Sequence, residues 1–200
     1  MGYSMKRKLA LVLVALLAGD GLAAEPVSSS AAEGMLYDTE SVGLQLASGL
    51  SKKEHATVKN LVPLIAKQTQ TKAKFFGALA YAPDEGLVSE SLQGAFNFHS
   101  VAAADKAALK ACQQAKKASS GACRLAARIL PPGYQAQALS LSHDASQGFF
   151  ARFLPATGTK FLAASQSTGA WAMGPSVDGA LAACAAKAKR AKDCRIVIAN

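Results

Sequence analysis

The sequence predicts an α+β fold in which two tandem hairpin–helix–strand repeats form an antiparallel sheet covered by helices. The first observation is a pair of similar stretches, ALKACQQAKKASSGACR (108–124) and ALAACAAKAKRAKDCR (180–195). The second is a Pro-x-x-Gly turn motif at 83–86 that returns at 155–158. The third is an alternating apolar run after each second cysteine. A period of 72 residues relates the first cysteines and the turn motifs, and a shared period across separated landmarks indicates an internal repeat.

The N-terminus has the features of a secretory signal peptide. A basic cluster, Lys6–Lys8, precedes the short apolar run Leu9–Ala18, and small residues follow where a signal peptidase cleaves. The run is shorter than the roughly 20 apolar residues that a membrane-spanning helix needs. We therefore expect removal of residues 1–23, no span across the membrane, and export to the periplasm or the medium. Asp20 stands where a lipoprotein signal would carry cysteine, so we expect no lipid anchor.

Two different segments separate the signal peptide from the repeats. Residues 24–34 are small and polar and predict a flexible lead. Residues 35–74 predict a mainly helical extension, because Ser51-Lys52-Lys53-Glu54 matches a capping box and apolar residues follow it at helical spacing. Pro63 should bend or end that helix. Alternating apolar residues in 37–48 leave open whether this part is a strand or a helix.

The two repeats are predicted to share a single domain, 75–200, with one repeat at 75–130 and the other at 149–200. Each should contain a strand, a turn, a return strand, a helix and a third strand. The expected strands of the first repeat are 75–82, 87–93 and 123–130, and Ser100 should cap a helix that reaches Lys117. The expected elements of the second are strands at 149–154, 159–165 and 194–199, with a helix at 177–190.

Alternation within the third strands predicts which residues share a face. It places one apolar set together on one face: Leu125, Ala127 and Ile129, with Ile196 and Ile198 as their equivalents. It places the arginines together on the opposite face: Arg124, Arg128 and Arg195.

The four cysteines predict two local disulfides. A cysteine late in a helix and another at the start of the next strand come close when the chain turns back. An exported chain with an even number of cysteines favours disulfides, and the repeat selects the pairs Cys112–Cys123 and Cys184–Cys194. Neither pair has Cys-x-x-Cys spacing or a nearby histidine, so we expect neither a metal site nor a redox pair.

The hairpin FFGALAYAPDEG, the helix with AL-x-AC and the strand that begins with CR resemble a family of bacterial secreted proteins catalogued as domain of unknown function 4189. The resemblance covers about residues 75–200. It implies repeated strand–turn–helix–strand units and a secreted location. It implies no catalytic residue, because that family has no settled activity.

The sequence offers few residues for catalysis. The best candidate nucleophile and base are Ser142 and His143 in SLSHDAS, but Asp144 adjoins the histidine, whereas a catalytic triad takes its carboxylate from across the fold. A polar loop is therefore the preferred interpretation. Asp84 and Glu85 lie in a turn where we expect solvation. The sequence contains no phosphate-binding glycine loop, zinc signature or calcium loop, so we expect no cofactor and no metal.

Charge and location define the preferred function. Removing residues 1–23 leaves 19 Lys and Arg against 12 Asp and Glu, a net charge of +7 that suits anionic surfaces. Basic residues are not interleaved with aromatic ones, which argues against nucleic acid. We predict a non-catalytic binding protein whose partner is an envelope protein, an anionic lipid headgroup or a cell-wall polymer. Candidate binding residues are Trp171 and the arginines of the third strands. An inhibitor or immunity protein and a small hydrolase are the alternatives.

Overall fold

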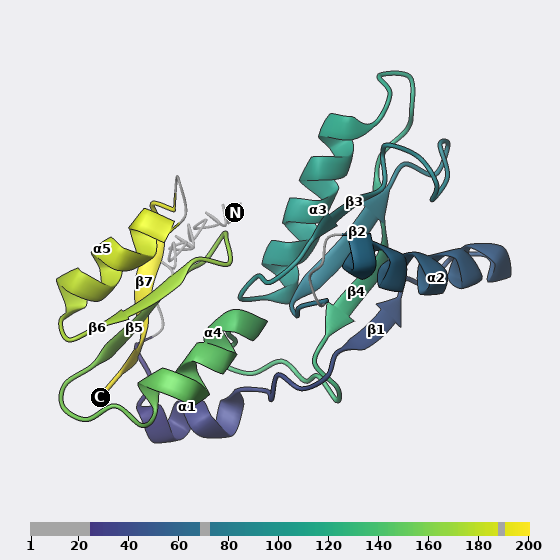
Figure 1. The fold of residues 1–200 in the computed structure, drawn as a ribbon. Helices are drawn as coiled ribbons and strands as arrows, with labels where there is room; N and C mark the ends of the chain where they lie inside the picture. Colours follow the sequence, from purple (N-terminus) through teal and green to yellow (C-terminus); the bar gives the residue numbers. More distant parts are fainter. Residues whose placement is uncertain (1–24, 69–72, 188–190) are drawn as a thin grey trace, which may run out of the picture.

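The computed structural model describes residues 25–68, 73–187 and 191–200, so the signal peptide expected at residues 1–23 lies outside the described residues. The chain is α+β, as predicted (Figure 1). The elements in order are α1 (Ser29–Met35), β1 (Gly43–Leu46), α2 (Lys52–Gln68), β2 (Gly77–Tyr81), β3 (Gln93–Ala95), α3 (Val101–Ala115), β4 (Arg124–Leu130), α4 (His143–Gly148), the π-helix η1 (Phe149–Phe153), β5 (Phe161–Ser165), β6 (Trp171–Gly174), α5 (Val177–Lys187) and β7 (Cys194–Ala199).

The strands divide between two antiparallel sheets. One sheet has the order β1-β4-β2-β3, and the other has the order β6-β5-β7. In both sheets a hairpin is followed by a helix and then by a strand that pairs beside the first strand of the hairpin. We call residues 77–130 the first unit and residues 161–199 the second unit.

The two sheets carry a β-bulge at the same place. Leu79 pairs with Ala127 and Ala80 with Leu125, so Ala126 is the extra residue of β4. In the second unit, Leu162 pairs with Ile198 and Ala163 with Ile196, so Val197 is the extra residue of β7. Each bulge follows the Cys-Arg dipeptide by the same number of residues, because Ala126 and Val197 both stand third after their cysteine.

The bulges correct the predicted faces of the third strands. An extra residue reverses which way the following side chains point. Ile196 therefore packs with Ala163 against α5, whereas Ile198 packs in the core on the other face of the sheet. Arg124 and Arg128 are likewise not on one face, since Arg124 reaches Glu54 of α2 and Arg128 reaches Asp105 of α3. Strict alternation assumed an unbroken ladder, which the sequence alone does not guarantee.

The predicted hairpin of the second unit was also wrong. Residues 149–154 are helical rather than a strand, and 161–165 form the first strand of that sheet instead of its return strand. The return strands are β3 and β6, not 87–93 and 159–165. The connection at 82–92 is much longer than the connection at 166–170, so one constant period does not align the hairpins. Gly86 and Gly158 both have a φ of 78°, so the two Pro-x-x-Gly motifs share a left-handed glycine but not a place in the topology.

Each sheet has a helical layer on both faces. The first sheet packs α3 against one face and α2 against the other, where Val58, Leu79 and Tyr81 are fully or nearly fully buried. The second sheet packs α5 against one face. Its other face packs against the largest core, where α4 and η1 contribute Phe149 and Phe153. This double covering gives each sheet a buried apolar cluster on both faces, although the chain has few aromatic residues.

The N-terminal segments differ from the predictions. The expected flexible lead contains α1, which Ser28 caps by accepting a hydrogen bond from the N–H of Ala31. Val27 forms a parallel bridge with Ile198. Within 35–74, the open choice at 37–48 is resolved as strand β1, which pairs with β4, and α2 continues through Pro63 to Gln68 instead of ending there. The capping box is confirmed, because Ser51 N–H donates to Glu54 Oε2 at 2.7 Å and Glu54 N–H to Ser51 Oγ at 3.2 Å.

Both predicted disulfides are present. Cys112 in α3 bonds Cys123 just before β4, and Cys184 in α5 bonds Cys194 at the start of β7. Both pairs have Cα atoms 6.2 Å apart. The predicted helices agree in place with α3 and α5, although residues 188–190 of the second lie outside the described residues.

Candidate functional site

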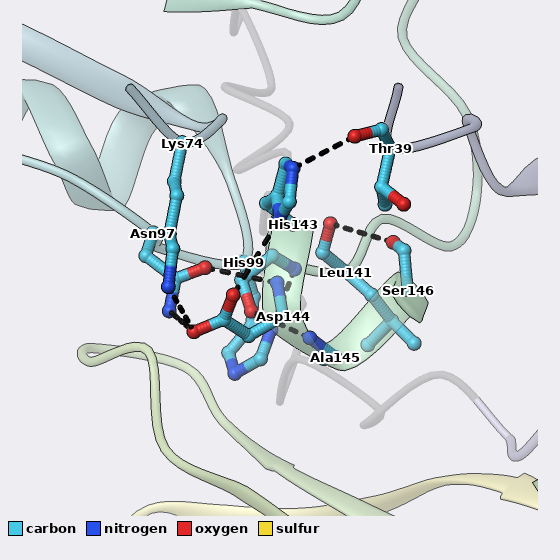
Figure 2. Close-up of polar contacts among 10 residues, drawn as sticks. Thr39, Lys74, Asn97, His99, Leu141, His143, Asp144, Ala145 and Ser146 are labelled. Carbon is cyan, nitrogen blue, oxygen red and sulfur yellow. Dashed lines mark hydrogen bonds and ion pairs between the residues drawn. The ribbon is translucent and has the colours of Figure 1, made fainter. Parts of the chain in front are cut away.

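The contact between the two units, which we call the seam, includes the start of α4, where the candidate residues Ser142 and His143 lie. It joins the loop before α3 to the start of α4 (Figure 2), and His99 also bonds Ala170 of the β5–β6 loop. In Figure 1, α3 lies on the side of the first sheet that faces the second unit.

Ser142 and His143 are not arranged as a nucleophile and its base. Ser142 caps α4, and its Oγ accepts a hydrogen bond from the N–H of Ala145 at 3.3 Å. His143 Nε2 donates to the carbonyl of Thr39 at 3.0 Å, since a carbonyl oxygen can only accept. Ser146 donates to the carbonyl of Leu141 rather than to a histidine (Figure 2). The geometry therefore does not support the hydrolase, and the polar loop preferred from the sequence was wrong in form, because these residues are the N-cap and first turn of helix α4.

Asp144 is the centre of a three-way contact. Its carboxylate Oδ2 accepts from Lys74 Nζ at 2.8 Å and from Asn97 Nδ2 at 3.0 Å. Asn97 also accepts a hydrogen bond from the N–H of Asp144 at 3.0 Å through its own Oδ1. Asn97 has a φ of 65°, a left-handed conformation that asparagine tolerates better than most residues. Lys74 and Asn97 were not predictable from the sequence, because their partner Asp144 lies far away along the chain.

His99 bridges the seam. Its Nε2 donates to the carbonyl of Ala170 in the β5–β6 loop at 2.9 Å, and its Nδ1 accepts from the N–H of Ser142 at 3.0 Å. The ring is 6% exposed, and burial lowers its pKa. The units also approach closely beside it, because a Cβ added to Gly169 would lie 2.1 Å from the carbonyl oxygen of Asn97.

A groove with a volume of 730 Å³ runs along the seam, and we call it the seam groove. Small residues of α3 line it, with Ala103 and Ala107 among them. Lys106 and Lys110 line one side, one helical turn apart, and the β5–β6 residues 166–168 line the other. Both lysines are exposed, and neither belongs to an ion pair found among the described residues.

A smaller polar pocket adjoins the seam groove. It has a volume of 120 Å³ and shares Ser100 and Gln166 with the groove. Arg195 lines it and bonds the side chain of Gln166 when the amide oxygen faces the guanidinium, with Arg195 Nε at 2.8 Å. Arg195 thus has a neutral partner and brings its positive charge to the end of the seam groove.

Arg124 and Arg128 have partners of opposite charge. Arg124 Nε donates to the hydroxyl of Tyr81 at 2.9 Å, and its Nη2 lies 3.3 Å from Glu54 Oε1. Arg128 binds Asp105 through two nitrogens, with Nη2 at 2.7 Å from Oδ2. The two arginines line a further groove of 570 Å³, but their charges are already compensated. Their contacts support a role in holding α2 and α3 on the sheet.

Trp171 packs in the core of the second unit. It is 8% exposed, and a Cβ added to Gly148 would lie 2.0 Å from its ring, so the indole fills the space above that glycine. The charged groups of Arg152 and Lys187 lie 5.3 and 4.7 Å from the ring centroid. This packing supports the core interpretation of Trp171 over that of an exposed ligand anchor.

Carboxylates hold both disulfide loops. In the first unit, Gly121 N–H donates to Asp84, whereas Ser120 Oγ and Lys117 N–H both donate to Glu85 and lower its pKa. In the second unit Ser165 Oγ donates to Asp193 at 2.7 Å. Burial raises the pKa of Asp193, but its hydrogen bonds outweigh this and hold the pKa below its usual range. The sequence predicted that the turn carboxylates Asp84 and Glu85 are simply solvated. In the structure both accept hydrogen bonds from the first disulfide loop.

Comparison with known proteins identifies no relative: no family model, no curated protein and no solved structure matches the chain. Within the part of the chain that the structure describes, no group of three or more His, Cys, Asp or Glu side chains could hold a metal ion. No helix in the same ranges is long and apolar enough to cross a membrane.

Proposed function

We propose that the protein is a non-catalytic binding protein of the periplasm or the medium that holds an anionic cell-wall polymer in the seam groove. The observation that carries the proposal is the position of Lys106 and Lys110, two lysines without an ion-pair partner among the described residues, on one side of a 730 Å³ groove between two units. Ligand sites occur preferentially at such junctions.

The shape of the site favours a chain over a flat surface. Residues 166–168 of the second unit and the exposed lysines of α3 line the same groove, so a strand of polymer in it would contact both units. Arg195 at the adjoining pocket extends the positive charge beyond the helix. A lipid headgroup layer is broad and flat, whereas a single strand of polymer can lie within a groove.

Two further observations support a location outside the cytoplasm and an internal duplication. Two disulfides in a small chain are typical of an oxidising compartment outside the cytoplasm. The matching bulges and disulfides of the two units favour an internal duplication, in keeping with the proposed resemblance to the secreted family of unknown function 4189. The signal peptide at residues 1–23 is part of this proposal.

The test measures binding of dextran sulfate, a polymer whose charges do not titrate near neutral pH, to the mature protein by calorimetry. We expect K106E/K110E to weaken binding at least about tenfold, a change of roughly 1.4 kcal/mol. The matched control K52E/K53E makes the same change of net charge at the exposed start of α2, and it should change the affinity less than about twofold. Binding should also weaken as salt is added.

Two results would contradict the proposal. Equal losses in K106E/K110E and K52E/K53E would show that net charge alone attracts the polymer. Binding to vesicles of anionic lipid without any binding to the polymer would assign the protein to a membrane surface instead.

A further inference from the structure

His99 lies at the end of the seam groove, between two residues that line it, Phe98 and Ser100. Its bond to the carbonyl of Ala170 ties the first unit to the loop that forms the opposite wall. Its bond from Ser142 ties the same ring to the start of α4. One imidazole therefore connects three segments that are far apart in the sequence.

Both bonds together require the neutral ring in one tautomer. Nε2 must carry a hydrogen because the carbonyl of Ala170 only accepts, and Nδ1 must be unprotonated because the N–H of Ser142 only donates. Protonation places a hydrogen on Nδ1 that points at the hydrogen of Ser142. The charged ring therefore loses its bond from the Ser142 N–H, and the two facing hydrogens repel each other. The ring must turn or move away so that water can solvate its charge.

The surroundings do not supply a better partner for the charged ring. His99 is 6% exposed, and burial lowers its pKa, although its hydrogen bond to the carbonyl of Ala170 and the charge of Asp193 act in the opposite direction. Arg195 of β7 lines the same small pocket and opposes a second positive charge. On α4, His143 donates to Thr39, and Asp144 is already bound by Lys74 and Asn97.

We propose that His99 is an acid-sensitive clasp, which holds the two walls of the seam groove together when neutral and releases them when protonated. The clasp itself rests on the hydrogen bonds of the seam. Its effect on ligand release rests on the proposed function of the seam groove. The polymer would then be held near neutral pH and released in an acidic environment, because a ligand that spans both walls loses one of them.

Two substitutions separate the titration from the contact. In His99→Gln the side-chain amide nitrogen takes the place of Nε2, so it can donate to Ala170 without titrating. In His99→Asn the side-chain oxygen takes the place of Nδ1, so it can accept from Ser142 but does not reach across the seam. We expect H99Q to hold the walls at every pH and H99N to leave them apart at every pH.

The experiment combines two readouts on the full mature protein at pH 7.5 and pH 5.0. Hydrogen exchange of the Ser142 amide, corrected for the intrinsic effect of pH, should accelerate at least about tenfold in acid in the wild type. The Kd for dextran sulfate should rise about tenfold over the same interval. In H99Q the Kd should change less than about twofold, and H99N should bind weakly at both pH values.

The readouts distinguish the two proposals. Unchanged exchange of Ser142 in acid, or the same rise of Kd in H99Q as in the wild type, would overturn the clasp and leave the seam groove as a binding site. No binding of polymer at either pH, together with accelerated exchange of Ser142, would overturn the proposed function and keep the clasp.

Discussion

Asn97 and Asp144 bond each other twice across the seam. The side-chain oxygen of Asn97 accepts from the Asp144 N–H, and the Asn97 amide donates to the Asp144 carboxylate, both at 3.0 Å. The pair joins the loop before α3 to the first turn of α4, and Lys74 adds an ion pair to the same carboxylate. This contact sets how the connecting segment sits against the first unit.

Replacing Asn97 should weaken the fold in two separable ways. Asn97→Gly removes both hydrogen bonds but accepts the positive φ, and it should lower the free energy of unfolding by about 1–3 kcal/mol. Asn97→Ala should cost about 1 kcal/mol more, because alanine is strained in the left-handed region. Urea denaturation of the three proteins measures both effects. Equal stability of the glycine and alanine variants would show that the backbone strain is absent.

Each disulfide should contribute to stability through the short loop that it closes. The double variants C112S/C123S and C184S/C194S should each lose about 2–4 kcal/mol of unfolding free energy. Thermal or urea unfolding of the oxidised proteins measures the loss. Non-reducing peptide mapping supplies the control, since a peptide that joins Cys112 or Cys123 to Cys184 or Cys194 would contradict the pairing.

Glu54 should make the stability depend on pH in the acid range. Its hydrogen bonds from the backbone of Ser51 and from Tyr81 lower the pKa to about 2 from an ordinary value of 4.5. The folded state therefore releases the proton more readily than the unfolded state, so the contribution is complete above about pH 4.5 and is lost as the pH falls toward 2. Melting temperatures of E54Q and the wild type should differ at pH 6 and converge near pH 2. A constant difference over that range would contradict the assignment.

The two units should unfold together. His99 bonds Ala170 of the second unit, and the start of α4, which connects the two units, bonds Lys74, Phe75 and Asn97. We expect one cooperative transition for the mature protein, and a fragment of residues 131–200 should be poorly folded alone. Calorimetry and the dispersion of an NMR spectrum of the fragment are the measurements. A native-like spectrum would show that the second unit is an independent module.

Features that depend on neighbouring residues were predictable from the sequence. The capping box at Ser51, the cap at Ser100 and the two cysteine pairs all arise within short stretches of chain, and the structure contains each of them. The third strands were predictable for the same reason, because alternation after each second cysteine marks their position.

Features that depend on distant residues were not predictable in the same way. The bulges at Ala126 and Val197 exist only through pairing with another strand, so the alternation pattern misplaced the arginines. The hairpin of the second unit was misplaced because 149–154 is apolar enough for a strand but packs as a helix. The spacing of Lys106 and Lys110 on a predicted helix was the one available signal for the seam groove, and only the second unit turns that helix face into a groove.

The most direct test of the central claim is a titration of the isotope-labelled mature protein with dextran sulfate, followed by NMR at pH 7.5. The account predicts that the largest shift changes fall on the residues that line the seam groove, on α3 at Lys106 and Lys110 and on the opposite wall at residues 166–168. The NMR signals of two neighbouring lysines of α2, Lys52 and Lys53, should shift little. Shift changes spread evenly over all exposed lysines, or confined to residues outside the seam groove, would contradict it.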